Sequence, residues 1–413
     1  DVAQFTPPHD KGVTEEVLAI EDLSTVKTTT EDEAVKAGKY QVIGKEIDDK
    51  YIAHVKAQVV NQEAIDRMQK EITIIYTPLH GTGNIPARRV MKELGFENVY
   101  VVPEQELPDG NFPTVSYPNP EAEEAFALGL KLAKEKNADL VLATDPDADR
   151  LGVYVKDTKS GEYIPLTGNM SGSLLCDYVL SQKQAKGEIP KDGQVIKSIV
   201  TTNLVDAVAA HYGCELVEVL TGFKYIGQQI LKEEQTGKGT YMFGMEESYG
   251  CLAGTYARDK DAISATAALC EAAAYYKEKG MTLWDAMVAM YEKYGYYKDT
   301  VKSIGLKGIE GLAKIQEIME NFRKNPRKVV SARDYKADTI TDLETGAVKP
   351  TGLPSSNVLY YDMTDGAWLC IRPSGTEPKI KFYYGIKGTS LEDAEAKSAK
   401  LGGELMDMVN QML

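Results

Sequence analysis

The sequence predicts two successive α/β units followed by an α+β unit. Strand-like and helix-like segments alternate twice between residues 71 and 279, which is typical of parallel sheets flanked by helices. After Lys298 the alternation stops, and three strand-like runs follow one helix. Asp365-Gly366 lies between the first two of these runs and is a strong hairpin signal, so the last sheet is expected to be antiparallel.

The first 60 residues are polar, and we expect helices at 12–19 and 45–60 with an acidic turn at 31–33 between them. The first α/β unit then begins with an apolar strand. Its expected elements are a strand at 71–77, a helix at 86–94, a strand at 99–102, a helix at 121–135 and a strand at 140–144. This order predicts a parallel sheet.

The second α/β unit is similar in size to the first, which suggests an internal duplication. Its expected elements are helices at 171–181, 203–212, 224–233 and 261–279, and strands at 195–198, 215–219 and 241–244. The last unit is expected to contain a helix at 306–323, strands at 359–363, 367–372 and 379–384, and a final amphipathic helix that begins at the capping pattern Ser390-Leu391-Glu392-Asp393.

Composition restricts the class of protein. Of the 413 residues, 43% are hydrophobic and 26% charged, as expected of a soluble globular protein with two to four domains. The net charge of −15 argues against nucleic-acid and membrane partners, and no apolar run is long enough to span a bilayer. The five scattered cysteines form no Cys-x-x-Cys pair, which argues against disulfides or zinc and favours the cytoplasm.

The segment Asp145-Pro146-Asp147-Ala148-Asp149-Arg150 is the most informative motif. It directly follows a strand-like run, and acids at alternate positions of an extended segment would point to one side. Like charges so close together are unfavourable unless a cation lies between them, and oxygen ligands favour Mg²⁺. Arg150 adds a guanidinium suited to a phosphate. The motif therefore predicts a Mg²⁺ site for phosphate chemistry.

Other interpretations of this motif are weaker. An EF-hand loop requires Gly at its sixth position and Glu at its twelfth, where this chain has Arg150 and Lys156. A haloacid-dehalogenase-type phosphatase would use Asp145 as its nucleophile, but it requires Thr or Val where Asp149 stands. An acidic surface loop without a ligand is the remaining alternative.

The segment Arg372-Pro373-Ser374-Gly375-Thr376 lies in a tight loop between two expected strands. Gly375 allows the backbone to turn so that successive N–H groups point at one anion. Ser374 and Thr376 add hydroxyl donors, and Arg372 adds a bidentate donor. The loop therefore predicts a phosphate site, with an ordinary Pro-Gly turn as the alternative.

Two further segments carry polar side chains. Glu246-Glu247-Ser248 follows an apolar strand and suits sugar hydroxyls, with an exposed polar loop as the alternative. Arg258-Asp259-Lys260-Asp261 precedes a long helix, for which Asp261 is a candidate N-cap. Its cations suit a substrate phosphate or a proton transfer, and a solvated charge run is equally compatible with the pattern.

The segment Leu79-His80-Gly81-Thr82-Gly83 partly mimics a dinucleotide-binding fingerprint. Pro86, however, occupies the position of the third glycine, where close packing of helix and strand leaves no room for a side chain. A proline in the first helical turn explains the pattern without a nucleotide.

In chain order, these motifs resemble those of the α-D-phosphohexomutases, specifically the phosphoglucomutase/phosphomannomutase group. The resemblance covers essentially the whole chain and rests on the segments Thr77-Pro78-Leu79-His80-Gly81, Asp145-Pro146-Asp147-Ala148-Asp149-Arg150, Gly222-Phe223-Lys224, Glu246-Glu247-Ser248, Arg258-Asp259-Lys260-Asp261 and Arg372-Pro373-Ser374-Gly375-Thr376. It implies a heart-shaped enzyme with a central cleft, three mixed α/β domains and a TATA-binding-protein-like α+β fourth domain.

The resemblance also divides the chain. Residues 1–45 are expected to be a remnant of the first domain, 46–165 the second domain with the metal loop, 166–297 the third with the sugar loop, and 298–413 the fourth with the phosphate loop. The implied reaction is reversible transfer of phosphate between C1 and C6 of a hexose phosphate. Glu247 matches glucose-preferring members, so glucose is favoured over mannose and pentose phosphates.

Mg²⁺ and glucose 1,6-bisphosphate are the cofactors that the resemblance implies. The implied metal ligands are Asp145, Asp147 and Asp149, and the implied catalytic residues are Arg150 and Lys260. The implied substrate-binding residues are Lys224, Glu246, Ser248, Arg258, Lys260, Arg372, Ser374, Gly375 and Thr376.

One motif of the family is absent from the chain. The phosphoserine of the family lies in a Thr-Ala-Ser-His-Asn-Pro motif, and Gln4-Phe5-Thr6-Pro7-Pro8 resembles the stretch that follows it. The chain is therefore expected to lack most of the first domain and to be inactive as it stands. The alternatives to a phosphoglucomutase are a phosphomannomutase or phosphopentomutase, a phosphatase that uses Asp145, and a non-catalytic sugar-phosphate binding protein.

Overall fold

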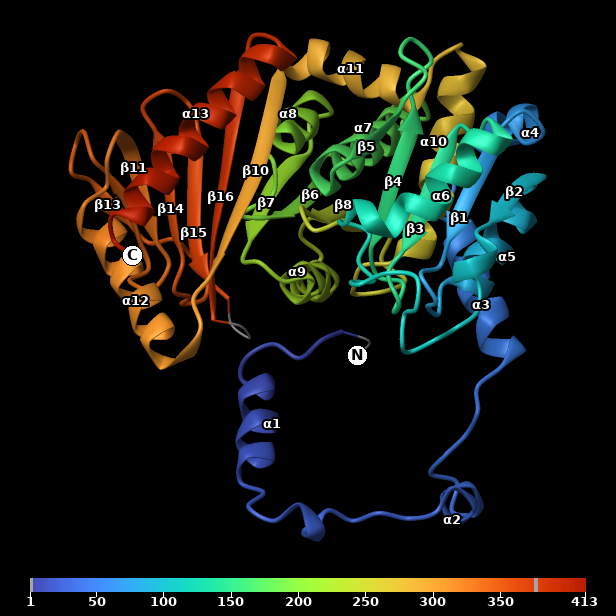
Figure 1. The fold of residues 1–413 in the computed structure, drawn as a ribbon, viewed down its shortest axis with the longest axis horizontal. Helices are drawn as coiled ribbons and strands as arrows, with labels where there is room; N and C mark the ends of the chain where they lie inside the picture. Colours follow the sequence, from blue (N-terminus) through green and yellow to red (C-terminus); the bar gives the residue numbers. More distant parts are fainter. Residues whose placement is uncertain (1–2, 375–377) are drawn as a thin grey trace.

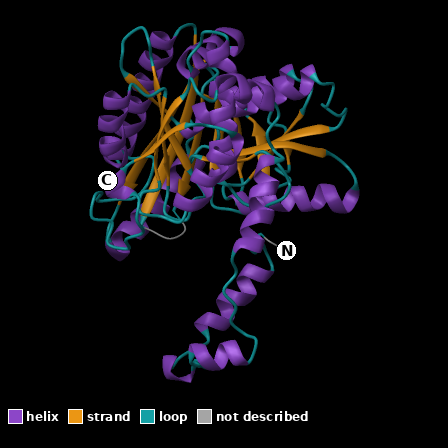
Figure 2. Ribbon diagram, turned by 90° about the vertical axis from the view of Figure 1, so that its right-hand side faces the viewer, coloured by secondary structure: helices purple, strands orange, loops and turns teal. Residues whose placement is uncertain are grey.

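The computed structural model describes residues 3–374 and 378–413. Three sheets lie side by side with helices on their faces, and the N-terminal arm, residues 3–44, projects from this body in two perpendicular views (Figures 1 and 2). The arm contains α1 (His9–Leu18), the short helix η1 (Leu23–Thr25) and α2 (Glu31–Lys36). The acidic turn predicted at 31–33 is instead the first turn of α2, because Thr30 and Glu33 form a capping box.

The first α/β unit has a five-stranded sheet in the order β2-β1-β3-β4-β5. The pairs β1–β2 and β1–β3 are parallel, as predicted, whereas β4 and β5 join antiparallel and were not predicted. The strands are β1 (Thr73–Thr77), β2 (Asn98–Val101), β3 (Leu140–Thr144), β4 (Leu151–Lys156) and β5 (Tyr163–Leu166). The helices are α3 (Lys45–Lys56), α4 (Gln62–Met68), α5 (Asn84–Leu94), η2 (Pro103–Gln105) and α6 (Glu123–Lys136).

The second α/β unit has a four-stranded sheet in the order β7-β6-β8-β9, with β9 antiparallel to β8. The strands are β6 (Gly193–Ser198), β7 (Glu215–Val219), β8 (Thr240–Glu246) and β9 (Gly250–Leu252). The helices are α7 (Gly168–Ala185), α8 (Leu204–His211), α9 (Phe223–Thr236), α10 (Ala262–Glu278) and α11 (Leu283–Tyr294).

The two units repeat one arrangement. In each, the first strand pairs in parallel with the second and third, and a fourth strand pairs antiparallel with the third. The acidic loop follows β3, and the Glu247-Ser248-Tyr249 turn follows β8. Ala148 and Tyr249, at corresponding places in these two connections, both have positive φ angles, 59° and 68°. The shared topology supports the duplication hypothesis and places the two loops at equivalent positions.

The last unit has a seven-stranded antiparallel sheet in the order β10-β16-β15-β14-β11-β12-β13. The strands are β10 (Tyr296–Gly305), β11 (Val329–Asp334), β12 (Thr339–Asp342), β13 (Val348–Lys349), β14 (Leu359–Met363), β15 (Trp368–Pro373) and β16 (Lys379–Gly388). Its helices are α12 (Gly308–Lys324) and α13 (Leu391–Asn410). The strands β10, β11, β12 and β13 were not predicted.

Both faces of this last sheet are covered. Along β15, Leu369 and Ile371 pack with α12 and α13, whereas Trp368 and Cys370 pack with Ile199 and the neighbouring apolar residues of the second unit. Successive side chains of a strand point to opposite faces, so this alternation attaches the last unit to the rest of the body. In the part of the chain that the structure describes, no helix has the length and apolar character needed to cross a membrane.

Glu271 of α10 joins the two α/β units. Its carboxylate accepts hydrogen bonds from the backbone N–H groups of Val60 (3.1 Å) and Asn61 (2.6 Å) and from the Tyr178 hydroxyl (2.8 Å). Burial raises the pKa of Glu271 from 4.5 to about 7, so the folded chain binds the proton more tightly than the unfolded chain. The stabilisation linked to this proton is present below pH 4.5 and is lost as the pH rises through about 7.

We therefore expect Glu271→Gln to flatten the pH dependence of stability. Relative to the variant, the unmodified chain should lose up to about 3 kcal/mol in the free energy of unfolding between pH 4.5 and pH 8. Urea unfolding across this range measures the difference. Glu292→Gln on α11 is the matched control, because Glu292 is exposed. If the free energy of unfolding changed with pH in the same way for Glu271→Gln and for the unmodified chain, the proposed link between the Glu271 proton and stability would be wrong.

Candidate functional site

The acidic loop between β3 and β4 turns sharply. Asp145 Oδ1 accepts hydrogen bonds from the backbone N–H groups of Asp149 (3.0 Å) and Arg150 (2.9 Å). One oxygen each of Asp145, Asp147 and Asp149 lie within 4.8 Å of one another. We predicted that these acids converge, but for the reason that the segment is extended. That reason is wrong, because a tight turn, with Ala148 at a φ of 59°, folds them together.

The three acids fit a divalent cation. Burial, together with the Asp149 and Asp147 charges, raises the pKa of Asp145 to about 7, although the hydrogen bond from the Arg150 N–H lowers it in part. Asp149 Oδ1 is buried and accepts no hydrogen bond. Each of these groups would gain from a positive charge among the three carboxylates, and hard oxygen ligands favour Mg²⁺ or Mn²⁺ over softer metals.

Two cations flank the triad. Arg150 Nε lies 3.5 Å from Asp149 Oδ1, and an Arg150 N–H group lies 3.3 Å from Glu121 Oε1. Lys260 Nζ lies 3.0 Å from Asp149 Oδ2. Burial lowers the pKa of Lys260, but the Asp149 and Asp259 carboxylates outweigh it, and the net direction is upward. Lys260 therefore stays protonated at neutral pH.

The Leu79–Gly83 segment supports the acidic loop. Thr82 donates two hydrogen bonds to the Pro146 carbonyl, from its N–H group (2.8 Å) and its hydroxyl (3.0 Å). A Cβ atom on Gly81 would collide with the backbone of Pro146, so only glycine fits between the two loops. The glycine pattern that resembles a nucleotide fingerprint thus serves close packing against the metal loop.

Backbone hydrogen bonds also connect the acidic loop to two other predicted segments. The Leu151 N–H donates to the Tyr249 carbonyl at 3.0 Å, which joins it to the sugar loop. The Ala262 N–H donates to the Ala148 carbonyl at 3.1 Å, which joins it to the start of α10. Asp261 caps that helix as predicted, since Asp261 Oδ1 accepts from the Ile263 N–H at 2.8 Å. Three motifs far apart in the sequence are therefore held side by side.

The segment Glu246-Glu247-Ser248, predicted to bind sugar hydroxyls, carries one buried and one half-buried acid. Glu246 ends β8 and accepts a hydrogen bond from the Gly222 N–H at 2.7 Å. Burial raises its pKa, while the nearby Lys260 and Arg150 charges lower it in part. Burial raises the pKa of Glu247 to about 7, and Glu247 accepts a hydrogen bond from the Ser198 hydroxyl at 3.3 Å.

The strands β15 and β16 of the last unit face this region, since Trp368 and Lys381 line a cavity together with Glu247. Arg372 of β15 lies opposite Lys381 of β16 in the strand register. The Arg372 charge offsets part of the rise in the pKa of Glu247. The Ser374 N–H donates to the Lys379 carbonyl at 2.7 Å. Gly375 and Thr376, the other two predicted phosphate ligands, lie outside the described residues.

A cavity of about 290 Å³ separates the last unit from the sugar loop. Its walls include Glu121, Glu247, Ser248, Asp299, Trp368 and Lys381. Sequence reasoning missed Glu121 and Lys381. Glu121 reads as an ordinary acid at the start of a helix, and Lys381 as one of many strand lysines, so neither carries a local signal.

Two predicted substrate-binding cations lie apart from the triad. The Lys224 ammonium lies 3.2 Å from Asp10 of the N-terminal arm, and the Arg258 guanidinium lies 2.5 Å from Glu234 of α9. Both line a second cavity, of about 380 Å³, against residues 3–7 and 9 of the arm. The structure therefore gathers Lys260 with the acids and leaves Lys224 and Arg258 in other ion pairs.

Models of one protein family match most of the chain. They describe the phosphoglucomutase/phosphomannomutase α/β/α domain II at residues 49–161, the α/β/α domain III at 167–294 and the C-terminal domain at 313–409. The chain belongs to the phosphoglucomutase/phosphomannomutase family. The resemblance seen in its motifs is thereby confirmed.

Curated relatives within the family are similar over much of the chain. A phosphoglucomutase from Staphylococcus saprophyticus is 33% identical over 396 residues, which cover 94% of this chain and 70% of the relative. One from Staphylococcus aureus is 36% identical over 363 residues, which cover 86% of this chain and 63% of the relative. The chain thus spans about two thirds of the length of these relatives.

Solved structures share the fold of the phosphoglucomutase/phosphomannomutase family. The open form of a phosphoglucomutase, pp63/parafusin, from Paramecium superposes with a TM-score of 0.62 at 19% identity, covering 89% of this chain and 62% of that one. A phosphoglucomutase/phosphomannomutase family protein from Burkholderia thailandensis gives 0.54 at 18% identity, covering 89% and 68%. The predicted order of two mixed α/β domains and an α+β domain is confirmed.

Proposed function

We propose that this polypeptide carries the metal, sugar and phosphate sites of a phosphoglucomutase, which interconverts glucose 1-phosphate and glucose 6-phosphate through glucose 1,6-bisphosphate. The observation that carries the proposal is the convergence of Asp145, Asp147 and Asp149 with Lys260 and Arg150. The curated relatives named phosphoglucomutase support the same activity. The domain boundaries predicted from the sequence stay part of this proposal.

In the proposed site, Asp145, Asp147 and Asp149 would hold Mg²⁺. When bound, Mg²⁺ would supply a Lewis acid that withdraws charge from a phosphate oxygen. Arg150 and Lys260 offset the negative charge that spreads over a phosphoryl group during its transfer. Because Asp149 contacts both cations, it fixes their positions relative to the metal site.

In the same proposal, Glu246 and Ser248 bind two hydroxyl groups of the sugar, and Glu247 favours glucose. The Gly222 N–H holds one Glu246 oxygen at 2.7 Å and leaves the other available to a ligand. Arg372, Ser374, Gly375 and Thr376 grip the phosphate that is not transferred. Lys381, on the wall of the 290 Å³ cavity, adds a positive charge on the same side.

The attacking sugar hydroxyl must lose a proton, so a base is required. Lys260 Nζ lies 3.0 Å from Asp149 Oδ2 and 3.1 Å from Asp259 Oδ1, which favours its role as a fixed cation over that of a base. We therefore assign Lys260 to charge neutralisation and expect the proton acceptor to be another group. Lys224 and Arg258 would contribute to substrate binding only after leaving Asp10 and Glu234.

A mutase assay tests the proposal. The Thr-Ala-Ser-His-Asn-Pro motif is absent from the 413 residues, so the assay compares this chain with one extended at its N-terminus by its own coding sequence. With glucose 1-phosphate, Mg²⁺ and trace glucose 1,6-bisphosphate, we expect the extended chain to form glucose 6-phosphate and this chain to stay at background. A mock purification from cells that express neither chain controls for contaminating mutase.

Other outcomes would favour the alternatives. Metal-dependent release of inorganic phosphate that Asp145→Asn abolishes would favour a phosphatase. Binding of glucose 6-phosphate by an extended chain that does not turn over would favour a sugar-phosphate binding protein. Faster turnover of mannose 1-phosphate than of glucose 1-phosphate would contradict the assignment of Glu247.

A further inference from the structure

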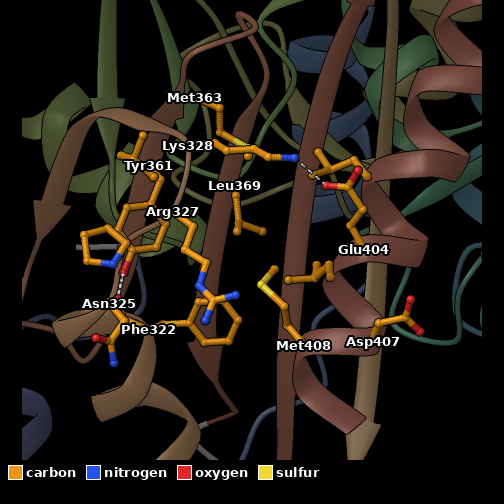
Figure 3. A pocket seen from close by; sticks show the side chains of 14 residues that line it. Phe322, Asn325, Arg327, Lys328, Tyr361, Met363, Leu369, Glu404, Asp407 and Met408 are labelled. Carbon is orange, nitrogen blue, oxygen red and sulfur yellow. Dashed lines mark hydrogen bonds and ion pairs between the residues drawn. The ribbon is translucent and has the colours of Figure 1, made fainter. Parts of the chain in front are cut away.

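We propose that a cavity in the last unit, remote from the acidic loop in sequence and fold, binds an organic monocarboxylate with an aromatic or branched apolar body. The cavity measures about 310 Å³ and lies between the end of α12, the strands β14 and β15, and the last turns of α13 (Figure 3). This volume is at the lower end of the range that small-molecule sites occupy.

The position of the cavity follows from the packing of two helices. Phe322 of α12 and Leu405 of α13 belong to one apolar cluster on the same face of the sheet. Both helices cover this face, and the cavity opens between their C-terminal turns, where the loop at 325–328 leads into β11. The space is therefore a gap in the core that reaches the surface.

The floor of the cavity is apolar. Phe322, Tyr361, Leu369 and Leu405 are each no more than 6% exposed. The Tyr361 hydroxyl already donates to the Phe322 carbonyl at 2.9 Å, so it is satisfied within the protein. Burial of an aromatic or branched aliphatic group against this surface is favourable. The hydroxyls of a sugar would find few hydrogen-bond partners there.

The mouth of the cavity carries one cation that is in no ion pair among the described residues. Lys328 donates to Glu404 at 2.9 Å, so these two charges offset each other. Within residues 3–374 and 378–413, the Arg327 side chain has neither an ion pair nor a hydrogen bond. In Figure 3 it extends from the loop toward Phe322 and Met408. A guanidinium in this position presents paired N–H donors to a carboxylate.

The loop that holds Arg327 has a constrained backbone. Lys328 has a φ of 55°, which is uncommon for a residue with a side chain. Its carbonyl accepts from the Thr364 N–H at 3.0 Å, and its ammonium is bound to Glu404. Residues kept in such conformations by their surroundings are frequent at ligand sites, and here they fix the start of the Arg327 side chain.

The charges select a monoanion. Asp407 of α13 also lines the cavity, on the side opposite Arg327 (Figure 3). Because Lys328 offsets Glu404, Asp407 is the acid that opposes Arg327 in this cavity, and it would repel a doubly charged phosphate more strongly than a singly charged carboxylate. The apolar floor then accommodates the rest of the molecule.

Calorimetric titration with 3-phenylpropionate tests the proposal. We expect saturable binding with a Kd below about 1 mM, about tenfold weaker binding to Arg327→Gln, and comparably weak binding of 3-phenylpropanamide to the unmodified chain. Arg327→Gln should no longer distinguish the acid from the amide. Met408→Trp, which fills the cavity, should abolish binding.

Lys324→Gln is the matched control, because Lys324 is an exposed cation three residues from Arg327 that does not line the cavity. It should bind 3-phenylpropionate like the unmodified chain, and thermal unfolding verifies that each variant is folded. No saturable binding at 10 mM would overturn the proposal, as would equal binding by Arg327→Gln and the unmodified chain. Tighter binding of inorganic phosphate through Arg327 would overturn the carboxylate class.

Discussion

Replacing Asp147 by Asn is expected to lower the affinity of the chain for Mn²⁺, used as a probe for Mg²⁺, on the order of 100-fold. Asp147 is the most exposed of the three acids, and its side chain has no hydrogen bond or ion pair to another described residue. Its loss removes one charged ligand without disturbing the turn, which depends on Asp145. Paramagnetic resonance of free Mn²⁺ during a titration measures the affinity.

Asp48→Asn serves as the control for a change in net charge, because Asp48 is exposed on α3 and outside the triad. It should bind Mn²⁺ like the unmodified chain. If Asp147→Asn also kept the full affinity, the acids would be a surface cluster rather than a metal site. Thermal unfolding of both variants without metal should be unchanged, which separates lost binding from lost folding.

Replacing Lys197 by Met is expected to destabilise the fold by about 1–3 kcal/mol, because it leaves the half-buried Asp206 carboxylate without its partner. Lys197 is only 1% exposed. Its ammonium lies 2.5 Å from Asp206 Oδ1 and 2.9 Å from Asn203 Oδ1. Burial raises the pKa of Asp206, which Lys197 offsets in part. Urea unfolding at neutral pH measures the loss.

A second substitution tests whether the pairing is the cause. Lys197→Met combined with Asp206→Leu removes both charges, and this double variant should recover much of the lost stability. Lys191→Met is the control, because Lys191 is exposed in the loop before β6. If the double variant lost the sum of the two single losses, Lys197 and Asp206 would act independently and the account would be wrong.

The sequence predicted the elements that carry strong local signals. The run Leu140-Val141-Leu142-Ala143-Thr144 is buried along its whole length, and its strand was predicted with the observed boundaries. Asp365-Gly366 forms the expected hairpin turn, with Gly366 at a φ of 81°. The residues that determine each of these elements are close together in the sequence. The elements can therefore be predicted from the local sequence alone.

Elements that depend on distant partners were missed. β9 has only three residues and is a strand because it pairs with β8. β11 and β12 are only partly buried, and β13 is exposed. The roles of Glu121 and Lys197 likewise come from contacts with residues elsewhere in the fold. Pairing over long sequence distances leaves no periodic pattern to read.

The acidic loop shows the same limit within one motif. The alternation of acids correctly indicated that the three carboxylates come together, but the shape of the loop depends on hydrogen bonds to Asp145 Oδ1 and on the close approach of Gly81 to Pro146. Neither is visible from spacing alone. Likewise, the ion pairs of Lys224 and Arg258 were not foreseen, since Asp10 and Glu234 carry no signal of their own.

The most direct test of the metal site is a crystal structure of this chain soaked in Mn²⁺, with anomalous scattering recorded. We expect one strong peak in the acidic loop at about 2.0–2.3 Å from an oxygen of each of Asp145, Asp147 and Asp149. A peak bound by other residues, or no peak at a saturating concentration of Mn²⁺, would contradict the site on which the proposed function depends.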